Sequence, residues 1–156
     1  MKKVLALGDM HCGHVVGLTP PDWRCSRRKA GDAQAALYDA FLEICKEAGK
    51  VDVCIVNGDC IDGKGEASGG TELITADREE QCEMAIAALA NVKAKKFVFT
   101  RGTPCHVGKE EDWENIIAER MDAKIHDVAF LSIDGVAFNV SHHAGSSAVP
   151  HGRHTE

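Results

Sequence analysis

The sequence has few aromatic residues, and its basic residues are outnumbered by acidic ones. Its 156 residues include two Trp, one Tyr and five Phe, so we expect no platform on which nucleic-acid bases stack. Lys and Arg number 18 against 24 Asp and Glu, a formal net charge of −6, whereas a general nucleic-acid coat needs a basic face. No apolar run approaches the ~20 residues of a membrane span, and none has the length of a signal-peptide core. These absences favour a cytoplasmic protein without a membrane partner.

Cysteine is plentiful, but seven is an odd number, so a fully paired disulfide framework within the chain is excluded. Cys45, Cys54 and Cys82 lie in apolar runs and are expected to be small buried side chains. The share of hydrophobic residues, 44%, is typical of a globular chain rather than a disordered one. The length suits one domain, so we expect a single domain over 1–156.

Hydrophobic periodicity alternates between strand-like and helix-like segments. It predicts strands at 4–7, 51–56, 96–100, 128–133 and 136–140, and helices at 32–48, 76–92 and 110–121. The long segment 10–31 is expected to be a loop, and the Asp134-Gly135 pair predicts a hairpin turn. This order indicates an α/β fold whose first part is largely parallel.

Three finer predictions concern the first strand and the first helix. The strand at 4–7 is a continuous apolar run, which predicts burial on both faces. Asp32 is expected to cap the helix and Gly49 to end it. The expected buried stripe of that helix consists of Ala33, Leu37, Phe41, Ile44 and Ala48.

Residues that can bind metal ions follow the predicted strands where each one ends. They are Asp9 and His11 after the first strand, Asp59 after the second, His106 after the third, and His142 and His143 after the last. Because the carboxyl ends of parallel strands converge on one crevice, we expect the first four and one or both of the last pair to meet. Carboxylates mixed with imidazoles suit Mn²⁺, Fe or Zn²⁺. A carboxylate such as Asp59 can bridge two ions ~3.5–4 Å apart.

The order of these motifs resembles the calcineurin-like metallophosphoesterase superfamily. The matching segments are Gly8-Asp9-x-His11, Gly58-Asp59-x-x-Asp62-Gly63, Gly102-Thr103-x-x-His106 and His142-His143, between residue 4 and about residue 145. The resemblance implies a sandwich of two mixed sheets flanked by helices. It also implies hydrolysis of phosphate esters, because the superfamily includes phosphatases, phosphodiesterases and nucleases.

The resemblance further implies two divalent ions, most simply Mn²⁺, with Fe or Zn²⁺ as the alternatives. Asp9 and His11 would hold the first ion, Asp59 would bridge both, and His142 or His143 would hold the second. The third family motif reads Gly-Asn-His-Asp/Glu, in which Asn binds the second ion and His protonates the leaving group.

This chain departs from the third motif and from the last one. Thr103 stands where Asn is expected and His106 comes three residues later, so His106 is either the catalytic acid or a recruited ligand. Thr103 and Asp62 are candidates for the second ion or for its surroundings. The family's Gly-His-x-His motif has no match, so we expect the chain to stop short of it and to lack the closing strands. In the alternative, His151 or His154 substitutes for it.

Other polar residues near these motifs each have two interpretations. His14 and Arg28 are candidates for contacting substrate phosphate, since Arg forks match phosphate geometry, but a loop His or a basic cluster (Arg24, Arg27, Arg28, Lys29) is also typical of a solvated surface. The cysteines next to the ligand motifs, Cys12, Cys60 and Cys105, are expected to be small fillers under the site. Their spacing lacks the paired pattern of a thiolate zinc site, which is the alternative.

The leading hypothesis is metal-dependent hydrolysis of a phosphate ester, with His106 as the proton donor. The substrate is a phosphorylated small molecule or a nucleic acid, and monoesters and diesters both stay open. The alternative hypothesis is a scaffold that keeps the fold, has lost turnover and binds another protein. A dinucleotide-binding site is excluded, because residues 8–13 do not form Gly-x-Gly-x-x-Gly.

Overall fold

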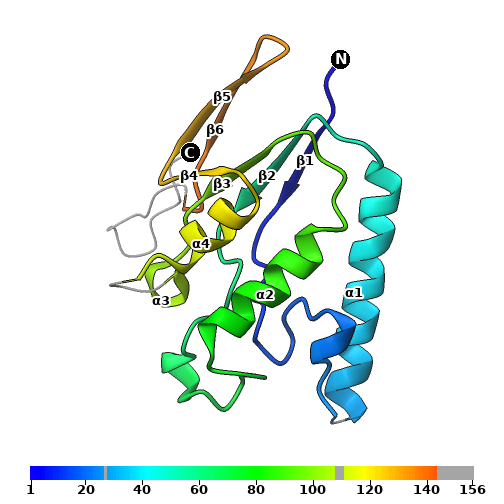
Figure 1. Ribbon diagram of the computed structural model, residues 1–156, viewed down its shortest axis with the longest axis vertical. Helices are drawn as coiled ribbons and strands as arrows, with labels where there is room; N and C mark the ends of the chain where they lie inside the picture. Colours follow the sequence, from blue (N-terminus) through cyan, green and yellow to red (C-terminus); the bar gives the residue numbers. More distant parts are fainter. Residues whose placement is uncertain (27, 108–110, 144–156) are drawn as a thin grey trace, which may run out of the picture.

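The computed structural model describes residues 1–26, 28–107 and 111–143, and it is an α/β structure with two separate sheets (Figure 1). The elements are, in chain order, β1 (Val4–Leu7), α1 (Arg28–Ala48), β2 (Val53–Asn57), α2 (Arg78–Leu89), β3 (Phe97–Thr100), α3 (Pro104–Val107), α4 (Trp113–Arg120), β4 (Lys124–His126), β5 (Ala129–Ile133) and β6 (Val136–Val140), with short 3₁₀ helices at Pro21–Trp23 and Glu66–Ser68. Strands β1 to β4 form a parallel sheet in that spatial order, and β5 pairs with β6 in an antiparallel hairpin. The α/β prediction is confirmed. The prediction of two mixed sheets is wrong for the described residues, because neither sheet combines the two pairing directions.

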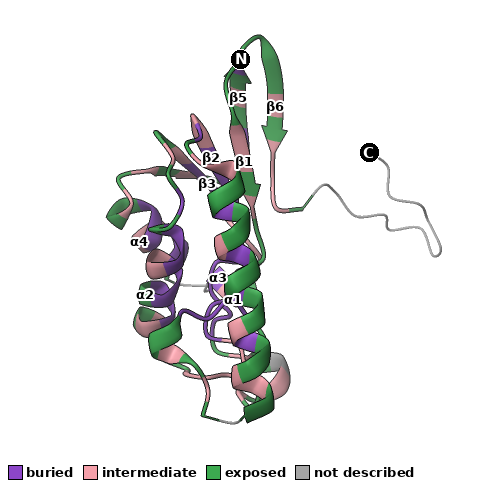
Figure 2. Cartoon of the chain, turned by 90° about the vertical axis from the view of Figure 1, so that its right-hand side faces the viewer, coloured by how far each residue is buried: buried purple, intermediate pink, exposed green. Residues whose placement is uncertain are grey.

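The main core lies between the parallel sheet and helices α1, α2 and α4. It contains Cys54, Val56 and Phe99 from the strands, packed with helix residues such as Phe41 and Ile117. Alternation along the strands turns other apolar residues toward the opposite face, where the β5–β6 hairpin lies near β3. Figure 2 shows α2 and α4 on one side of the strands and the hairpin on the other. Cys45, Cys54 and Cys82 are buried, as predicted.

The prediction that β1 is buried on both faces is wrong. β1 is an edge strand of the described sheet, and its Ala6 is exposed on the face away from the helices. β2 lies between two neighbours, and its Cys54, Ile55 and Val56 are all buried. β3, the other interior strand, is buried over its last three residues. The two interior strands therefore have the two-sided burial that is typical of parallel sheets.

Helix α1 begins at Arg28, four residues before the predicted start, so Asp32 lies inside the helix and does not cap it. Its buried residues are Gln34, Tyr38, Phe41 and Cys45, whereas Leu37 and Ile44 of the predicted stripe are exposed. The stripe is displaced because Gln34 turns inward and hydrogen-bonds the preceding loop: its Nε2 donates to Val15 O (2.7 Å) and its Oε1 accepts from Cys25 N (2.8 Å). Gly49, at a φ of 59°, follows the end of the helix as predicted.

Two short elements escaped prediction, and the hairpin turn is confirmed. Helix α3 and strand β4 contain four and three residues, too few for a periodic signal. β4 ends at His126, in a segment for which no strand was predicted. Asp134 and Gly135 both have positive φ, 50° and 82°, which is the conformation of a type I′ hairpin turn. His151 and His154 lie outside the described residues. No helix among the described residues is long and apolar enough to span a membrane.

Strand register places the candidate ligands at one edge of the sheet. Leu7 of β1 pairs with Val56 of β2, and Asn57 of β2 pairs with Thr100 of β3. The three parallel strands therefore end at nearly the same level. The loops that begin at residues 8, 58 and 101 leave the sheet side by side.

Candidate metal centre

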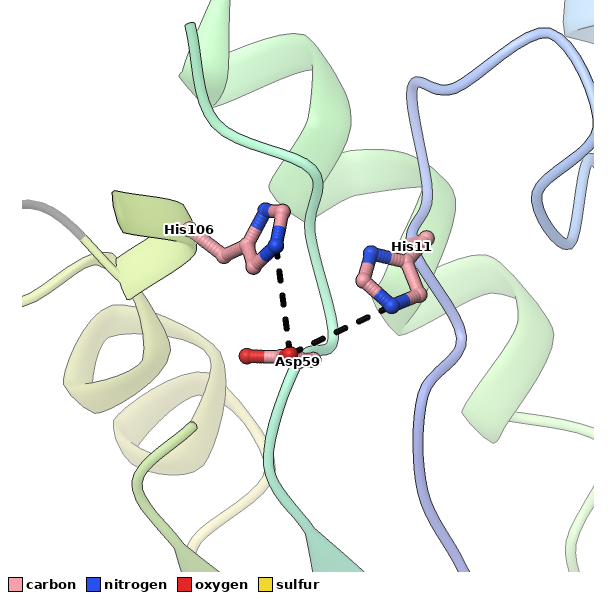
Figure 3. Close-up of side chains that lie close together, drawn as sticks. All are labelled: His11, Asp59 and His106. Atoms are coloured by element: carbon pink, nitrogen blue, oxygen red, sulfur yellow. Dashed lines mark ion pairs between the residues drawn. The ribbon is translucent and has the colours of Figure 1, made fainter. Parts of the chain in front are cut away.

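The candidate ligands meet at this edge around one buried carboxylate, that of Asp59. Among the described residues, two groups of side chains could each hold an ion, and both contain Asp59: His11, Asp59 and His106 form one, and Asp9, Asp59 and His142 form the other. Within each group, one ligand atom from every residue lies within 4.8 Å of the others. Figure 3 shows the rings of His11 and His106 directed at Asp59, His11 from the loop after β1 and His106 from helix α3. The predicted convergence of the strand ends is confirmed.

The spacing around Asp59 suits a shared cation. Its Oδ2 lies 3.1 Å from Nε2 of His142 and 4.0 Å from Nε2 of both His11 and His106. Asp9 Oδ1 is 3.8 Å from His11 Nε2 at the exposed side of the cluster. Two atoms that each bind one ion at roughly 2.0–2.2 Å are separated by about 3–4 Å. The residues present therefore fit divalent ions with mixed nitrogen and oxygen ligands.

Each of the three imidazoles is held at its Nδ1 by an oxygen. His106 Nδ1 donates to the backbone carbonyl of Asp62 and His142 Nδ1 to that of Asn57, both at 2.8 Å. His11 Nδ1 lies 3.0 Å from the carboxylate Oδ1 of Asp62. A proton on Nδ1 leaves the Nε2 lone pair of each ring directed at the central carboxylate. This is the arrangement by which proteins orient metal-binding histidines.

Asp62 orients two of these rings and does not face the centre itself. Its carboxylate holds His11 and its backbone carbonyl holds His106, while its side chain is buried and belongs to neither candidate group. Of the two predicted roles for Asp62, ligand of the second ion or part of its surroundings, the geometry favours the second.

Thr103 fixes the orientation of the central carboxylate. Its backbone N–H donates to Asp59 Oδ1 at 2.6 Å, and its hydroxyl donates to Asp59 Oδ2 at 3.0 Å. Both carboxylate oxygens are thus held by one residue of the segment that follows β3. Thr103 belongs to neither candidate group, so its contacts favour a role in the surroundings of the ions.

The geometry distinguishes His142 from His143. His142 belongs to a candidate group, whereas His143 is exposed and its Nε2 lies 3.4 Å from Thr103 Oγ1. Burial lowers the pKa of His142, but the Asn57 carbonyl and the carboxylates of Asp59 and Asp9 outweigh that effect and raise the pKa. The negative charge that faces this ring therefore favours a cation.

Three residues of the cluster have an unusual backbone conformation. Asp9, His11 and Asp59 have φ values of 52°, 44° and 50°, in the left-handed region that residues with a Cβ rarely occupy. Only two other non-glycine residues in the described part of the chain have positive φ, Asp122 and Asp134. Such strain costs about 1–3 kcal/mol per residue and is concentrated at functional sites in proteins.

Glycines allow the loops to pack closely around Asp59. A Cβ on Gly58, whose φ is 72°, would lie 2.6 Å from the Cα of Gly102 and 2.7 Å from Nδ1 of His142. A Cβ on Gly102 would lie 2.1 Å from Oδ1 of Asp59. Both positions need glycine because the loops touch each other there.

Glu114, on α4, is a site residue that the sequence analysis missed. Its side chain is fully buried, with Oε1 accepting from the N–H of Cys60 and Oε2 from the N–H of Gly102, both at 2.8 Å. Burial raises its pKa, against the lowering effect of these two hydrogen bonds. Glu114 ties together the loops that carry Asp59 and Thr103. The available signal was its position three residues before the core residue Ile117, on the buried face of the helix.

Neither of the two residues predicted to contact phosphate belongs to the candidate metal centre. His14 belongs to neither candidate group, and its Nε2 lies 3.8 Å from Glu72 Oε2. Arg28 is 95% exposed at the start of α1, with Nε 4.0 Å from Asp32. The position of Arg28 agrees with a solvated surface, whereas His14 lies at the margin of the cluster. Arg27 lies outside the described residues.

The cysteines beside the ligand motifs do not join the centre. Cys12 and Cys60 are fully buried, and burial raises the pKa of both thiols well above the usual value. Neither candidate group among the described residues contains a cysteine. Cys12 and Cys60 are fillers, as predicted, but Cys105 is exposed on α3, so that prediction is wrong for Cys105.

A scan against protein-family models and a search of curated proteins give no match for this chain. The function of the site is therefore argued from its own residues. Their arrangement at a shared carboxylate is the main observation.

Proposed function

We propose that this chain binds two divalent ions around Asp59 and hydrolyses phosphate esters. The observation that carries the proposal is the set of three imidazoles, each held at Nδ1 and aimed with Nε2 at one buried carboxylate. Such a set has no evident use in packing, because it directs three lone pairs and a negative charge at the same small region. Mixed carboxylate and imidazole ligands suit Mn²⁺, with Fe and Zn²⁺ as the alternatives.

The proposed division of ligands follows the two candidate groups. His11, Asp59 and His106 would hold one ion, and Asp9, Asp59 and His142 would hold the other. This division differs from the one that the family resemblance implies, in which Asp9 and His11 share an ion. It also uses His106 as a ligand, the alternative to acid catalysis that the displaced third motif left open.

The chain's own residues then have separate tasks in hydrolysis. Thr103 and Asp62 keep the carboxylate and two rings in place, so little reorganisation is needed during the reaction. Bound ions would supply electrostatic stabilisation of a phosphoryl oxygen and a lowered pKa for water. His143, exposed beside Thr103, would give a proton to a leaving oxygen in this proposal.

Removal and reloading of metal test the proposal. We expect the chelated protein to be inactive toward p-nitrophenyl phosphate and its bis-p-nitrophenyl diester, and Mn²⁺ to restore hydrolysis of one or both. Mass spectrometry of the reloaded protein should count close to two Mn²⁺ ions per chain. A count of one or none, with no hydrolysis in Mn²⁺, Fe²⁺ or Zn²⁺, would contradict the proposal.

Removing the hydroxyl of Thr103 should weaken metal binding without unfolding the protein. In Thr103→Val, the backbone N–H still holds Asp59 Oδ1, but Oδ2 loses its donor. We expect the affinity for Mn²⁺ to fall about tenfold or more, the lower end of the effect of residues that orient metal ligands. Calorimetric titration measures it, and Thr71→Val, in an exposed loop, is the control. Equal Mn²⁺ affinities in the two variants would show that the Thr103 hydroxyl has no role in metal binding.

A further inference from the structure

An apolar groove lies between α1 and the loop that follows β1. Its volume is about 460 Å³, within the range of pockets that bind small molecules, roughly 300–1,000 Å³. The apolar side chains that line it include Leu7, Met10, Val16, Leu37, Phe41 and Ile44. Figure 1 shows α1 beside the β1 edge of the sheet.

Several apolar side chains on the walls of the groove are exposed instead of being packed into the core. Leu37 and Ile44 on α1 are 45% and 50% exposed, and Val16 on the opposite wall is 63% exposed. Isolated apolar residues on a surface are ordinary, but three that converge on one concavity form a candidate contact surface for an apolar group. The groove is therefore suited to contact hydrocarbon.

The groove borders the candidate metal centre. Asp9 and His11, which belong to the two candidate groups, line the groove together with His14 and Asp62. The polar side chains of the lining are these four, and the side chains beyond them are apolar. A bound molecule would thus meet both residues of the ligand cluster and hydrocarbon in the same groove.

We propose that the groove holds the apolar arm of the substrate, an alkyl or aryl group on the alcohol of the phosphate ester. This inference rests on the proposed function, because the ions at Asp59 would bind the phosphoryl group where the groove borders the candidate metal centre. Leu37 and Ile44 are the specificity residues of this arrangement. Sugar phosphates fit the groove poorly, because its apolar walls present no side-chain partners for a row of hydroxyl groups.

Binding of n-alkylphosphonates to the Mn²⁺-loaded protein tests the inference without turnover. Titration calorimetry with ethyl-, hexyl- and decylphosphonate separates the contribution of the head group from that of the chain. Full burial of one methylene is worth up to about fourfold in affinity, and the groove is open on one side. We expect hexylphosphonate to bind about tenfold or more tighter than ethylphosphonate.

Substitutions on the groove wall locate the alkyl chain. Leu37→Ser and Ile44→Ser should each reduce the hexyl-to-ethyl affinity ratio at least about threefold, the effect of one lost methylene contact or more. Their affinity for ethylphosphonate should fall by a smaller factor than their affinity for hexylphosphonate. Both residues are exposed, so the variants are expected to fold. Phe130→Ser, on β5 and 77% exposed, is the matched control and should leave the ratio unchanged.

The outcomes distinguish this inference from the proposed function. Suppose that ethylphosphonate binding needs Mn²⁺, but that a longer alkyl chain gives no gain in affinity, or a gain that survives Leu37→Ser and Ile44→Ser. Either result would overturn the inference and leave the proposed function standing. The proposed function would be overturned if no phosphonate binds in Mn²⁺ while 1-hexanol still binds and Leu37→Ser weakens that binding. Dimerisation in sedimentation that Leu37→Ser abolishes would assign the groove to a second copy of the chain and overturn the inference.

Discussion

In the Asp59→Asn variant, we expect Mn²⁺-dependent hydrolysis to fall by about a thousandfold or more, which corresponds to the loss of several kcal/mol of electrostatic stabilisation. Asp59 is the one residue common to both candidate groups, so its charge serves both ions. An amide keeps the shape and one oxygen but removes the charge. The NH₂ group of the Asn side chain would also face either a hydrogen-bond donor of Thr103 or the imidazole nitrogens, in the place of a carboxylate oxygen.

The folded structure should survive this substitution. Asp59 has a φ of 50°, and Asn is among the residues that tolerate the left-handed region. Asp122→Asn is a matched control, because Asp122 has nearly the same φ, 51°, and lies outside the cluster. Circular dichroism and the urea midpoint would verify that both variants are folded.

Metal counting gives the second readout for Asp59→Asn. Mass spectrometry should find close to two Mn²⁺ ions in the parent and in Asp122→Asn, and one or none in Asp59→Asn. Parental hydrolysis with two ions in Asp59→Asn would show that the bridging assignment is wrong. One ion or none in the parent as well would favour the alternative of a binding scaffold.

For Glu114→Ala, we expect the free energy of unfolding to fall by about 3–5 kcal/mol, since one buried and one half-buried N–H group lose their acceptor at about 1–3 kcal/mol each. Those donors belong to Cys60 and Gly102, each adjacent to a residue of the site. The substitution also leaves a cavity beneath the loops. The loops should separate, so Mn²⁺ binding should weaken together with stability.

Urea denaturation without metal measures this effect separately from binding. Glu119→Ala is the matched control, because Glu119 is exposed on the same helix, and its change should stay within about 0.5 kcal/mol. The free energy of unfolding of Glu114→Gln should lie between those of the parent and Glu114→Ala. The carbonyl oxygen of Gln accepts one N–H, while its NH₂ group faces the other N–H donor. A loss below about 1 kcal/mol in Glu114→Ala would mean that water replaces the carboxylate and that Glu114 does not support the loops.

Much of the architecture and of the candidate site could be predicted from the sequence. Short apolar runs that end in Gly-Asp indicated parallel strands with ligands at their carboxyl ends, and Asp9, His11, Asp59 and His106 indeed meet there. That inference succeeded because strand direction and side-chain order are local properties, and parallel pairing brings equivalent ends together. The hairpin turn at Asp134 was predictable for the same reason, since its conformation depends on two adjacent residues.

The tertiary structure decided what depends on contacts between distant segments. It separated His142 from His143, divided the ligands between two groups, and placed Glu114 beneath two loops that lie 54 and 12 residues away in the chain. It also turned Gln34 inward and left Leu37 and Ile44 on the wall of a groove. Periodicity identifies residues that share a face but does not specify what covers that face. Which nitrogen faces a carboxylate, and which apolar face stays open, follows from the packing of whole elements against one another.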